Sequence, residues 1–491
     1  MAIVSQFASV SRHPLRRAVL SSLFSLFPIT ATACSGADAV SEPLTVDSAV
    51  RQDAGDTNDP LGDTPIDQGT DTGGALDTGP IDVGLDAPFG TPAIKHVVVI
   101  VQENHTFDSY FGRWCTAPAG SSPTCTSGPS CCERAPDTDP GGTSPRTLDD
   151  AANGDYDPNH AQSCEVTEID SGKMDHFTTG ASCSDKRNFA IAPDATVSTY
   201  KALATKYALA DRYFQPLAGA SSANDMYFAA ARFVFTDNEY KPASNGKGCI
   251  APTTPTKTYT GQKTVADLLI DAGHTFGFYA EGYRAMRSTL LCPSAPADCT
   301  GPSFGLSPCN YDCSDVPFEY YAQFLDNDTY MKDGDDFAKD LAAGTLPELS
   351  FIKFTAYHNE HPGFGTKISN GVATVQKAID AVLTSSRYQD DTLVLLTWDE
   401  GGGFFDHVAP PKDSAVDGKP YGMRVPLLAI GKFARSGAIS HVEMEHSSIV
   451  KFVEYLFLGG KTGQLSARDA VVHNIGSMLD ETKTGVVIPA D

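Results

Sequence analysis

Two short stretches of the chain are dominated by apolar, largely β-branched residues, and polar residues end each of them. One stretch covers residues 94–101 and the other covers residues 392–398. Runs of this length and composition are typical of strands that are buried on both faces of a parallel sheet. The pattern therefore predicts two central strands, one near each end of the folded part of the chain.

Other segments carry apolar residues at helical spacing. Residues 372–383 and 448–458 show such stripes, and residues 264–270 follow an N-cap threonine and lead, through Gly273, to a strand-like stretch at 275–279. Helical and strand patterns that alternate in this way favour an α/β fold with a mostly parallel central sheet flanked by helices.

The first 34 residues have the pattern of an export signal. A basic start precedes an apolar run at residues 18–29 and then small residues that end around Cys34. The apolar run is too short to remain as a membrane-spanning helix. Ala33, Cys34 and Ser35 resemble a lipobox, so we expect an exported protein that is either secreted or anchored in the cell envelope by a lipid on Cys34.

Residues 35–90 differ from the rest of the chain in composition. They carry twelve acidic side chains and one arginine among glycine, threonine and proline. Too few apolar side chains are present to offset the entropy of ordering, so we expect a disordered acidic linker. The carboxylate spacing of a calcium-binding EF-hand loop is missing. Residues 91–491 then form the expected folded domain.

Composition excludes some classes of protein. The 491 residues carry 36 basic and 61 acidic side chains, with a formal net charge of −25. Nucleic acid is not expected as a partner, because phosphate binding needs clustered basic residues. Only the N-terminal segment approaches a membrane-spanning pattern, which excludes a polytopic membrane protein.

Cysteines also indicate export. Besides Cys34, eleven lie between residues 115 and 313: Cys115, Cys125, Cys131, Cys132, Cys164, Cys183, Cys249, Cys292, Cys299, Cys309 and Cys313. In an exported chain this density favours disulfides, whereas the spacing does not form the paired units of a zinc site. Eleven is odd, so one thiol is free or pairs between chains, and the connectivity stays open.

Both central strands end in oxygen-bearing side chains. Glu103 and Asn104 follow the first strand, and Asp399 and Glu400 follow the second. Ligands bind at the carboxyl edge of open parallel sheets, so these side chains could converge there. Carboxylate and amide oxygens suit a hard divalent cation.

The same residues carry a family resemblance. Residues 103–112 resemble the EN-x-x-FD-x-x-FG motif of the bacterial phosphoesterase family, which unites phospholipases C with certain secreted acid phosphatases, and residues 399–411 resemble its DE-x-GG-x-x-DHV-x-PP block. Shorter blocks match in the family's order at residues 157–160, 172–175, 219–224, 346–352, 360–362 and 422–426.

The resemblance implies an alkaline-phosphatase-like core with one divalent metal ion and a hydroxyl nucleophile. Carried over by position, the metal ligands would be Glu103, Asn104, Ser221, Asp399 and Glu400. Ser221 would be the nucleophile, with Ser222 as the nearest alternative. A bound dication would lower the pKa of the hydroxyl and draw charge from the phosphoryl oxygens.

Histidines supply candidates for proton transfer. His160 and His361 could protonate the leaving oxygen or hold phosphoryl oxygens, because histidine titrates in the useful range. His407 could serve the architecture of its loop instead, and His446 could be a cap or packing residue. The chain departs from the family pattern at Ala223 and Asp225, where proline and a basic residue or histidine are usual.

These features predict a secreted, metal-dependent phosphoric ester hydrolase. Serine at position 221 and the absence of modules after the core favour an acid-phosphatase-like phosphomonoesterase. A phospholipase C that hydrolyses phosphatidylcholine-type diesters is the alternative, and a non-catalytic surface lipoprotein is the alternative of another class. The C/S-x-P-x-R motif of sulfatases is missing. Expected partners are a phosphate ester or phospholipid, with membrane contact only through the lipid anchor.

Overall fold

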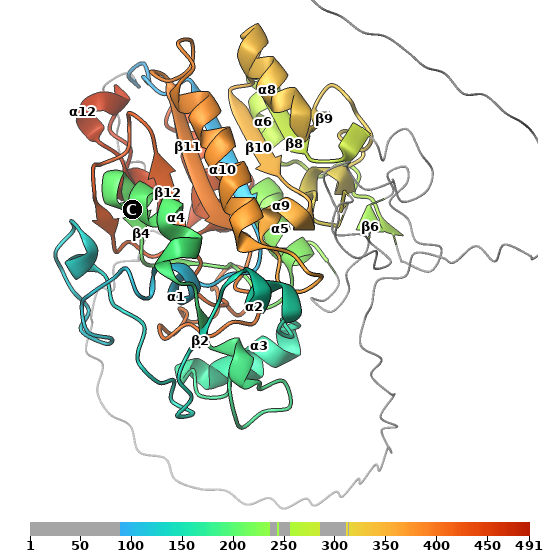
Figure 1. Ribbon diagram of the computed structural model, residues 1–491. Helices are drawn as coiled ribbons and strands as arrows, with labels where there is room; N and C mark the ends of the chain where they lie inside the picture. The colour runs from blue at the N-terminus through green and yellow to red at the C-terminus, as the bar shows by residue number, and fades with distance from the viewer. Residues whose placement is uncertain (1–88, 236–242, 245–255, 285–310, 313) are drawn as a thin grey trace, which may run out of the picture. The chain divides into compact units, whose positions relative to one another are not determined.

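A mixed sheet of eight strands forms the centre of the computed structural model, which describes residues 89–235, 243–244, 256–284, 311–312 and 314–491 (Figure 1). In spatial order the strands are β13 (Ile439–Ser440), β4 (Ala208–Ala210), β12 (Leu427–Ile430), β11 (Thr392–Trp398), β1 (His96–Gln102), β10 (Leu349–Lys353), β8 (Phe276–Ala280) and β9 (Met331–Asp333). Only β12 runs against its neighbours. The predicted α/β fold class with a mostly parallel central sheet is confirmed.

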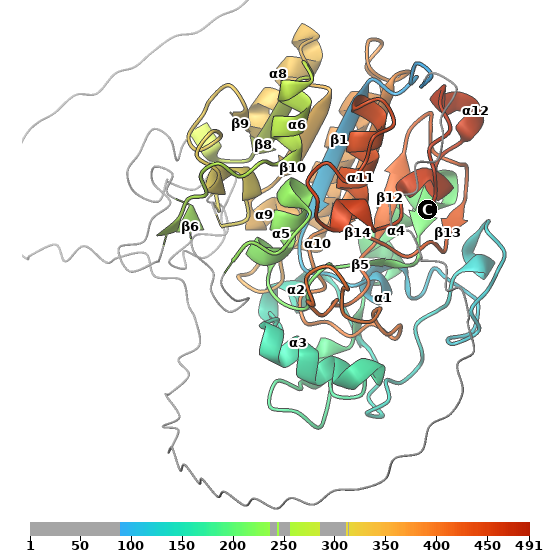
Figure 2. The ribbon, with the colours of Figure 1, turned by 180° about the vertical axis from the view of Figure 1, so that it is seen from behind.

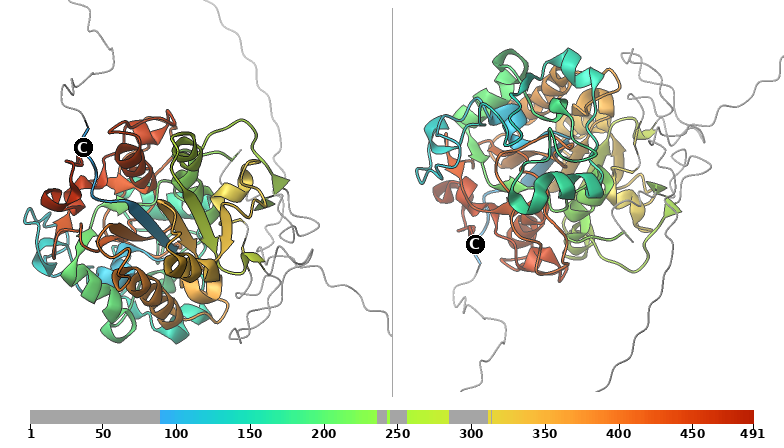
Figure 3. Two further views of the ribbon diagram at one scale, coloured as in Figure 1. Left: turned by 90° about the horizontal axis from the view of Figure 1, so that it is seen from above. Right: turned by 90° about the horizontal axis from the view of Figure 1, so that it is seen from below.

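Helices cover both faces of this sheet. Helices α4 (Asp194–Lys206), α8 (Gly334–Ala343) and α10 (Ile368–Leu383) lie on one face, and α5 (Ser221–Ala230), α6 (Val265–Asp271) and α11 (His446–Phe457) lie on the other (Figures 1 and 2). Figure 3 looks at the sheet from above and from below, with helices on both sides of it. The strands are buried from both faces, which explains their nearly continuous apolar composition.

The predicted elements agree with the observed ones to within a few residues. The strand predicted at 392–398 is β11, and the strand predicted at 94–101 is β1. The expected N-cap at Thr264 is present, since its side chain and that of Asp267 form a capping box at the start of α6. Helix α10 begins four residues earlier than its apolar stripe, at Ile368.

Shorter elements lie outside the central sheet. They are α1 (Phe107–Phe111), α2 (Asp150–Asp155), α3 (Gln162–Ile169), α9 (Ala356–Asn359) and α12 (Glu481–Thr484), with the strand pairs β2 (Arg146–Thr147) and β3 (Ala190–Ile191), β5 (Tyr213–Phe214) and β14 (Met444–Glu445), and β6 (Ala243–Ser244) and β7 (Thr256–Lys257). Helices α1, α2 and α3 lie beyond the carboxyl end of β1 (Figures 1 and 2). Among the described residues, no helix is both long and apolar enough to cross a membrane.

Six cysteines form three disulfides: Cys115–Cys132, Cys125–Cys131 and Cys164–Cys183. For these six the expectation of disulfides rather than a zinc site is confirmed. The other cysteines, the signal segment, the lipobox at Cys34 and nearly all of the acidic linker lie outside the described residues.

Candidate active site

The ends of β1 and β11 place four candidate ligands side by side. The two strands are parallel neighbours whose last paired residues are Gln102 and Trp398, so the next residues of each strand emerge together. The backbone N–H of Asn104 donates to Asp399 Oδ1 at 3.2 Å, and the N–H of Glu400 donates to the same oxygen at 2.7 Å. Asn104 adopts a left-handed φ of 55° at this turn.

Ser221 reaches this edge from the first position of α5. Its Oγ lies 3.4 Å from Asn104 Oδ1 and 3.4 Å from Glu400 Oε1. The hydroxyl of Ser222 instead donates to Asp315 at 3.3 Å. Of the two adjacent serines, it is therefore Ser221 that faces the ends of the central strands.

The loop before Ser221 is held by polar side chains. Asn224 accepts a hydrogen bond from the Leu217 N–H at 3.0 Å and donates to Gly219 O at 2.8 Å. Glu165 of α3 accepts from the Gly219 N–H at 2.5 Å. Both side chains are fully buried, so these hydrogen bonds hold the loop that leads to Ser221.

Both candidate histidines direct the same ring nitrogen to the site. Nδ1 of His160 lies 2.9 Å from the carbonyl of Pro158, and Nδ1 of His361 lies 2.7 Å from the carbonyl of Pro362. A carbonyl only accepts, so each Nδ1 carries a proton. Nε2 of His361 lies 3.2 Å from Asn104 Nδ2, and Nε2 of His160 lies 3.9 Å from Glu400 Oε1.

Lys353, at the end of β10, enters the same cluster. Its Nζ lies 3.0 Å from Glu103 Oε1, 2.9 Å from Asp225 Oδ2 and 3.6 Å from Asp399 Oδ2. Burial opposes the positive charge, but the three carboxylates together raise the pKa of Lys353 well above its ordinary value. The motifs gave no role to Lys353. A single charged residue at the carboxyl end of an apolar strand was the available clue.

The buried carboxylates of this cluster would be stabilised by positive charge. Burial raises the pKa of Glu103, Asp225 and Glu400 well above the ordinary range. The charge of Lys353 lowers the pKa of Glu103 and Asp225 in part, whereas neighbouring carboxylates raise the pKa of all three. Asp399 Oδ2 is buried and accepts no hydrogen bond from the described residues. A buried carboxylate oxygen without a donor, among further oxygen atoms, fits a hard divalent cation.

Glu360 anchors the loop that carries His361. Its buried carboxylate accepts hydrogen bonds from Tyr110 at 2.6 Å, from Trp398 Nε1 at 3.3 Å and from Tyr200. Glu360 has a left-handed φ of 78°, which a non-glycine residue adopts only when its surroundings hold it. These donors therefore fix the direction in which His361 leaves the loop.

His407 and His446 lie behind the site. His407 contacts Asp108 at 2.8 Å and Glu133 at 3.2 Å, and although burial opposes its charge, Asp108 raises its pKa to about 9. His446 donates to the carbonyl of Asp399 at 2.6 Å, and burial lowers its pKa to about 3. His407 is therefore architectural, and His446 is the first residue of α11 rather than its cap, which is Glu445.

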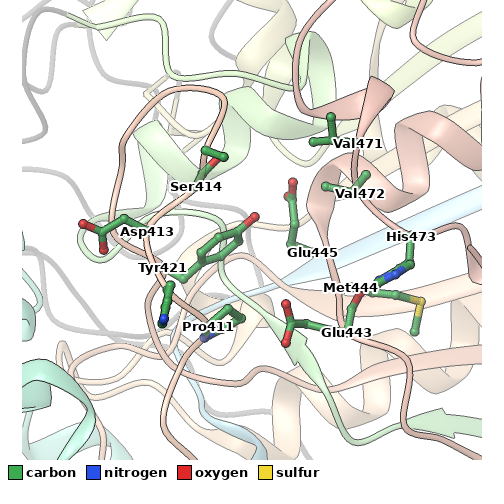
Figure 4. Close-up of a pocket in the computed structure, with 12 residues that line it drawn as sticks. Pro411, Asp413, Ser414, Tyr421, Glu443, Met444, Glu445, Val471, Val472 and His473 are labelled. Carbon is green, nitrogen blue, oxygen red and sulfur yellow. Dashed lines mark hydrogen bonds between the residues drawn. The ribbon is translucent and has the colours of Figure 1, made fainter. Parts of the chain in front are cut away.

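Other groups of metal-binding residue types occur among the described residues. Asp157, His160 and His361 adjoin the site, whereas Asp108, Asp406 and His407 belong to the ion-pair network of Arg424. A pocket of about 260 Å³ around Tyr421 and Glu445 contains none of the candidate ligands (Figure 4). We assign no chemistry to that pocket.

Residues 94–458 match the model of the Phosphoesterase family. The chain belongs to this family. It is 27% identical over 54% of its length to a non-specific phospholipase C of Arabidopsis thaliana, 26% identical over 57% to the hemolytic phospholipase C of Pseudomonas aeruginosa, and 25% identical over 79% to phospholipase C B of Mycobacterium tuberculosis.

The matches cover 48%, 41% and 78% of those relatives, so the chain spans less than half the length of the first two. Solved structures that resemble it include a protein of the alkaline phosphatase superfamily from Vibrio parahaemolyticus, at 11% identity and a TM-score of 0.34, covering 78% of this chain and 71% of that one. The match to the family model confirms the family predicted from the two strand-end motifs.

Proposed function

We propose that the chain is a metal-dependent phosphoric ester hydrolase whose nucleophile is Ser221. The family and the phospholipase C relatives support the reaction class. The observation that carries the nucleophile is the convergence of the Ser221 hydroxyl with Asn104 and Glu400, at 3.4 Å from each. In this proposal residues 91–491 form the catalytic domain.

The proposed ligands of one divalent ion are the oxygens of Glu103, Asn104, Ser221, Asp399 and Glu400. When bound, such an ion supplies positive charge that favours the ionised hydroxyl and stabilises the phosphoryl oxygens. Asp399 Oδ2 accepts no hydrogen bond from the described residues, with Lys353 Nζ at 3.6 Å, and this oxygen and the carboxylates raised in pKa by burial support a cation at this point.

The side chains have distinct proposed roles in the reaction. Ser221 Oγ attacks phosphorus, the new Oγ–P bond forms, and the bond from phosphorus to the leaving oxygen breaks. His160 or His361, protonated at Nε2, gives its proton to that oxygen. Water then attacks phosphorus and gives a proton to that histidine, which is neutral after the first step, and the Oγ–P bond breaks to release phosphate or a phosphorylated headgroup. Ser221 Oγ, whose proton went to solvent before the first attack, takes up a proton and is a hydroxyl again. Glu360 positions His361 and does not touch the substrate.

Two substrate classes have support. Phospholipase C activity on phosphatidylcholine-type diesters is supported by relatives that carry this name. Acid-phosphatase-like activity on monoesters is supported by serine rather than threonine at position 221, according to the resemblance to the family. We propose the phospholipid as the first substrate to test and the monoester as the second.

Export is part of the proposal. The N-terminal pattern of residues 1–34 and the three disulfides support an exported protein. Acylation at Cys34 would anchor it in the cell envelope, and cleavage without acylation would release it.

The decisive experiment assays the purified chain on phosphatidylcholine and p-nitrophenyl phosphate, with and without a chelator. We expect Ser221→Ala to lower kcat/KM by at least about 10³-fold on the preferred substrate. Ser222→Ala is the matched control and should retain most of the activity. Equal losses of activity in the two variants would contradict Ser221 as the nucleophile. Full turnover after metal removal would contradict the proposed ion.

A further inference from the structure

Lys353 is an unusual occupant of an acidic centre because three carboxylates surround its ammonium group. Its side chain is 4% exposed, and those of its partners Glu103, Asp225 and Asp399 are 2%, 2% and 0% exposed. Two of these partners, Glu103 and Asp399, are proposed metal ligands. The third partner, Asp225, is not a proposed ligand; it lies in the second turn of α5, four residues after the proposed nucleophile.

The strand fixes where this positive charge lies. Lys353 pairs in register with Val101 of β1, two residues before Glu103, so its side chain leaves the sheet beside the proposed ligands. The distances of 2.9 and 3.0 Å to Asp225 and Glu103 are those of charge-assisted hydrogen bonds. The ammonium thus lies between the three carboxylates.

Without Lys353, these three carboxylates would form a second cation site. Glu103 and Asp399 would each present an oxygen to it, and Asp225 would add one that is not among the five proposed ligands. Carboxylates shared between two ions are the usual basis of two-metal centres, in which the ions lie about 4 Å apart. The ammonium of Lys353 contacts all three groups and competes directly for that position.

We propose that Lys353, held by Asp225, occupies the second cation position of the centre and restricts it to one divalent ion. This inference rests on the proposed metal site. It also explains the acidic residue at position 225, where the family resemblance leads one to expect a basic residue or histidine. Asp225 balances the charge of Lys353 and keeps its ammonium between the carboxylates. A covalently attached charge of this kind stays in place when a chelator removes the ion.

The test measures the number of bound metal ions and not the enzymatic activity. The full chain is equilibrated with Mn²⁺ and dialysed, and bound manganese is measured by mass spectrometry together with the electron paramagnetic resonance spectrum. Wild type should bind one Mn²⁺ with an uncoupled spectrum. Lys353→Gln should bind two, with the spectrum of a spin-coupled pair, because the amide keeps a hydrogen-bond donor but no charge.

A second substitution separates this effect from simple damage. Lys353→Gln/Asp225→Asn removes the carboxylate that belongs only to the second position, so it should return the count to one. Lys332→Gln is the matched control, because Lys332 lies on β9, which β8 separates from β10, and it pairs with Asp340 at 2.5 Å instead. It should bind one ion, as wild type does.

Each ion count either supports or overturns the proposed role of Lys353. Two ions or none in the wild type would overturn the inference, and this measurement needs no variant. One ion in Lys353→Gln, or two in the double variant, would also overturn it. A wild type that binds one ion but hydrolyses neither phosphatidylcholine nor p-nitrophenyl phosphate would contradict the proposed function and leave the ion count as evidence for Lys353.

Discussion

The phenol of Tyr110 donates a 2.6 Å hydrogen bond to the buried carboxylate of Glu360, the residue that precedes His361 in the chain. Burial raises the pKa of this carboxyl to about 7, although its hydrogen-bond donors lower it. Tyr110 lies on α1, directly after the strand end that carries Asn104. The same donor therefore connects the two sides of the proposed site, Asn104 in the turn after β1 and His361 on its loop.

Tyr110→Phe should reduce activity because loss of the hydrogen bond to Glu360 allows the neighbouring His361 to shift. Removing a donor to a buried carboxylate costs about 1–3 kcal/mol of folding free energy. We expect kcat to fall while KM changes little, because the substrate contacts remain but proton donation is misaligned. Stability is measured by urea denaturation and activity by steady-state kinetics.

Tyr279→Phe is the matched control for that variant. Its phenol donates to Asp340 at 2.7 Å, and neither residue contacts the proposed site. It should lose stability to a similar degree and keep its kcat. If both variants lose kcat in proportion to stability, Tyr110 has no positioning role.

The roles of His160 and His361 can be separated by the leaving group. The histidine that protonates the leaving oxygen should matter little for a nitrophenolate, which leaves without a proton, and should matter about 10²-fold or more for an alkyl ester. A histidine that only holds phosphoryl oxygens should affect both substrates equally. His160→Ala and His361→Ala are compared on p-nitrophenyl and alkyl phosphates, or on diesters with the same two leaving groups if diesters are preferred.

Two outcomes of this comparison would rule out a single histidine as the general acid. If both variants lose the same factor on both esters, neither histidine is the general acid. If both lose activity only on the alkyl ester, the two share the proton. The geometry favours a difference, because the Nε2 of His361 faces Asn104 at 3.2 Å whereas that of His160 lies 3.9 Å from Glu400.

Features that arise from local pattern could be predicted from the amino-acid sequence. The runs that form β1 and β11 are apolar and β-branched, and parallel strands place their carboxyl ends at one edge. For this reason the residue pattern alone was enough to expect Asn104, Asp399 and Glu400 to lie together. Thr264 could likewise be recognised as an N-cap from its neighbours in the chain.

Long-range polar partners could not be predicted. Lys353 and Asp225 are 128 residues apart, and nothing in either local sequence indicates the other. The acceptor role of Glu360 depends on Tyr110, Tyr200 and Trp398, which come from three separate elements. Such contacts depend on which side chains the folded sheet and helices bring together, and a single sequence without aligned relatives does not contain that information.

Stability should depend on the protonation of His407. Its pKa in the fold is about 9, above the value near 6.5 of an unfolded histidine. Its charge is balanced by Asp108 and Glu133, with Asp406 and Arg424 packed behind them. The stabilisation is complete below about pH 6.5 and is lost as the pH rises through about 9.

Over that interval the wild type should lose up to about 3 kcal/mol more than His407→Gln does. Urea denaturation at a series of pH values measures the difference between the two proteins. His473→Gln, at an exposed histidine, is the control and should follow the wild type. Parallel curves for wild type and His407→Gln would show that the ring is not charged in the fold.

The disulfide Cys164–Cys183 should support activity as well as stability. It closes 19 residues and holds α3, whose Glu165 accepts the N–H of Gly219 just before Ser221. Replacing both cysteines by serine should cost about 3 kcal/mol, against about 2 kcal/mol for the shorter loop closed by Cys125 and Cys131. Only the Cys164 and Cys183 substitutions should also lower kcat, because the loop that this disulfide closes contains Glu165, which bonds the backbone just before Ser221. Both double variants are compared by urea denaturation and by kinetics under conditions where each remains folded, and an equal kcat in the two would show that α3 does not need this cross-link to hold the nucleophile loop.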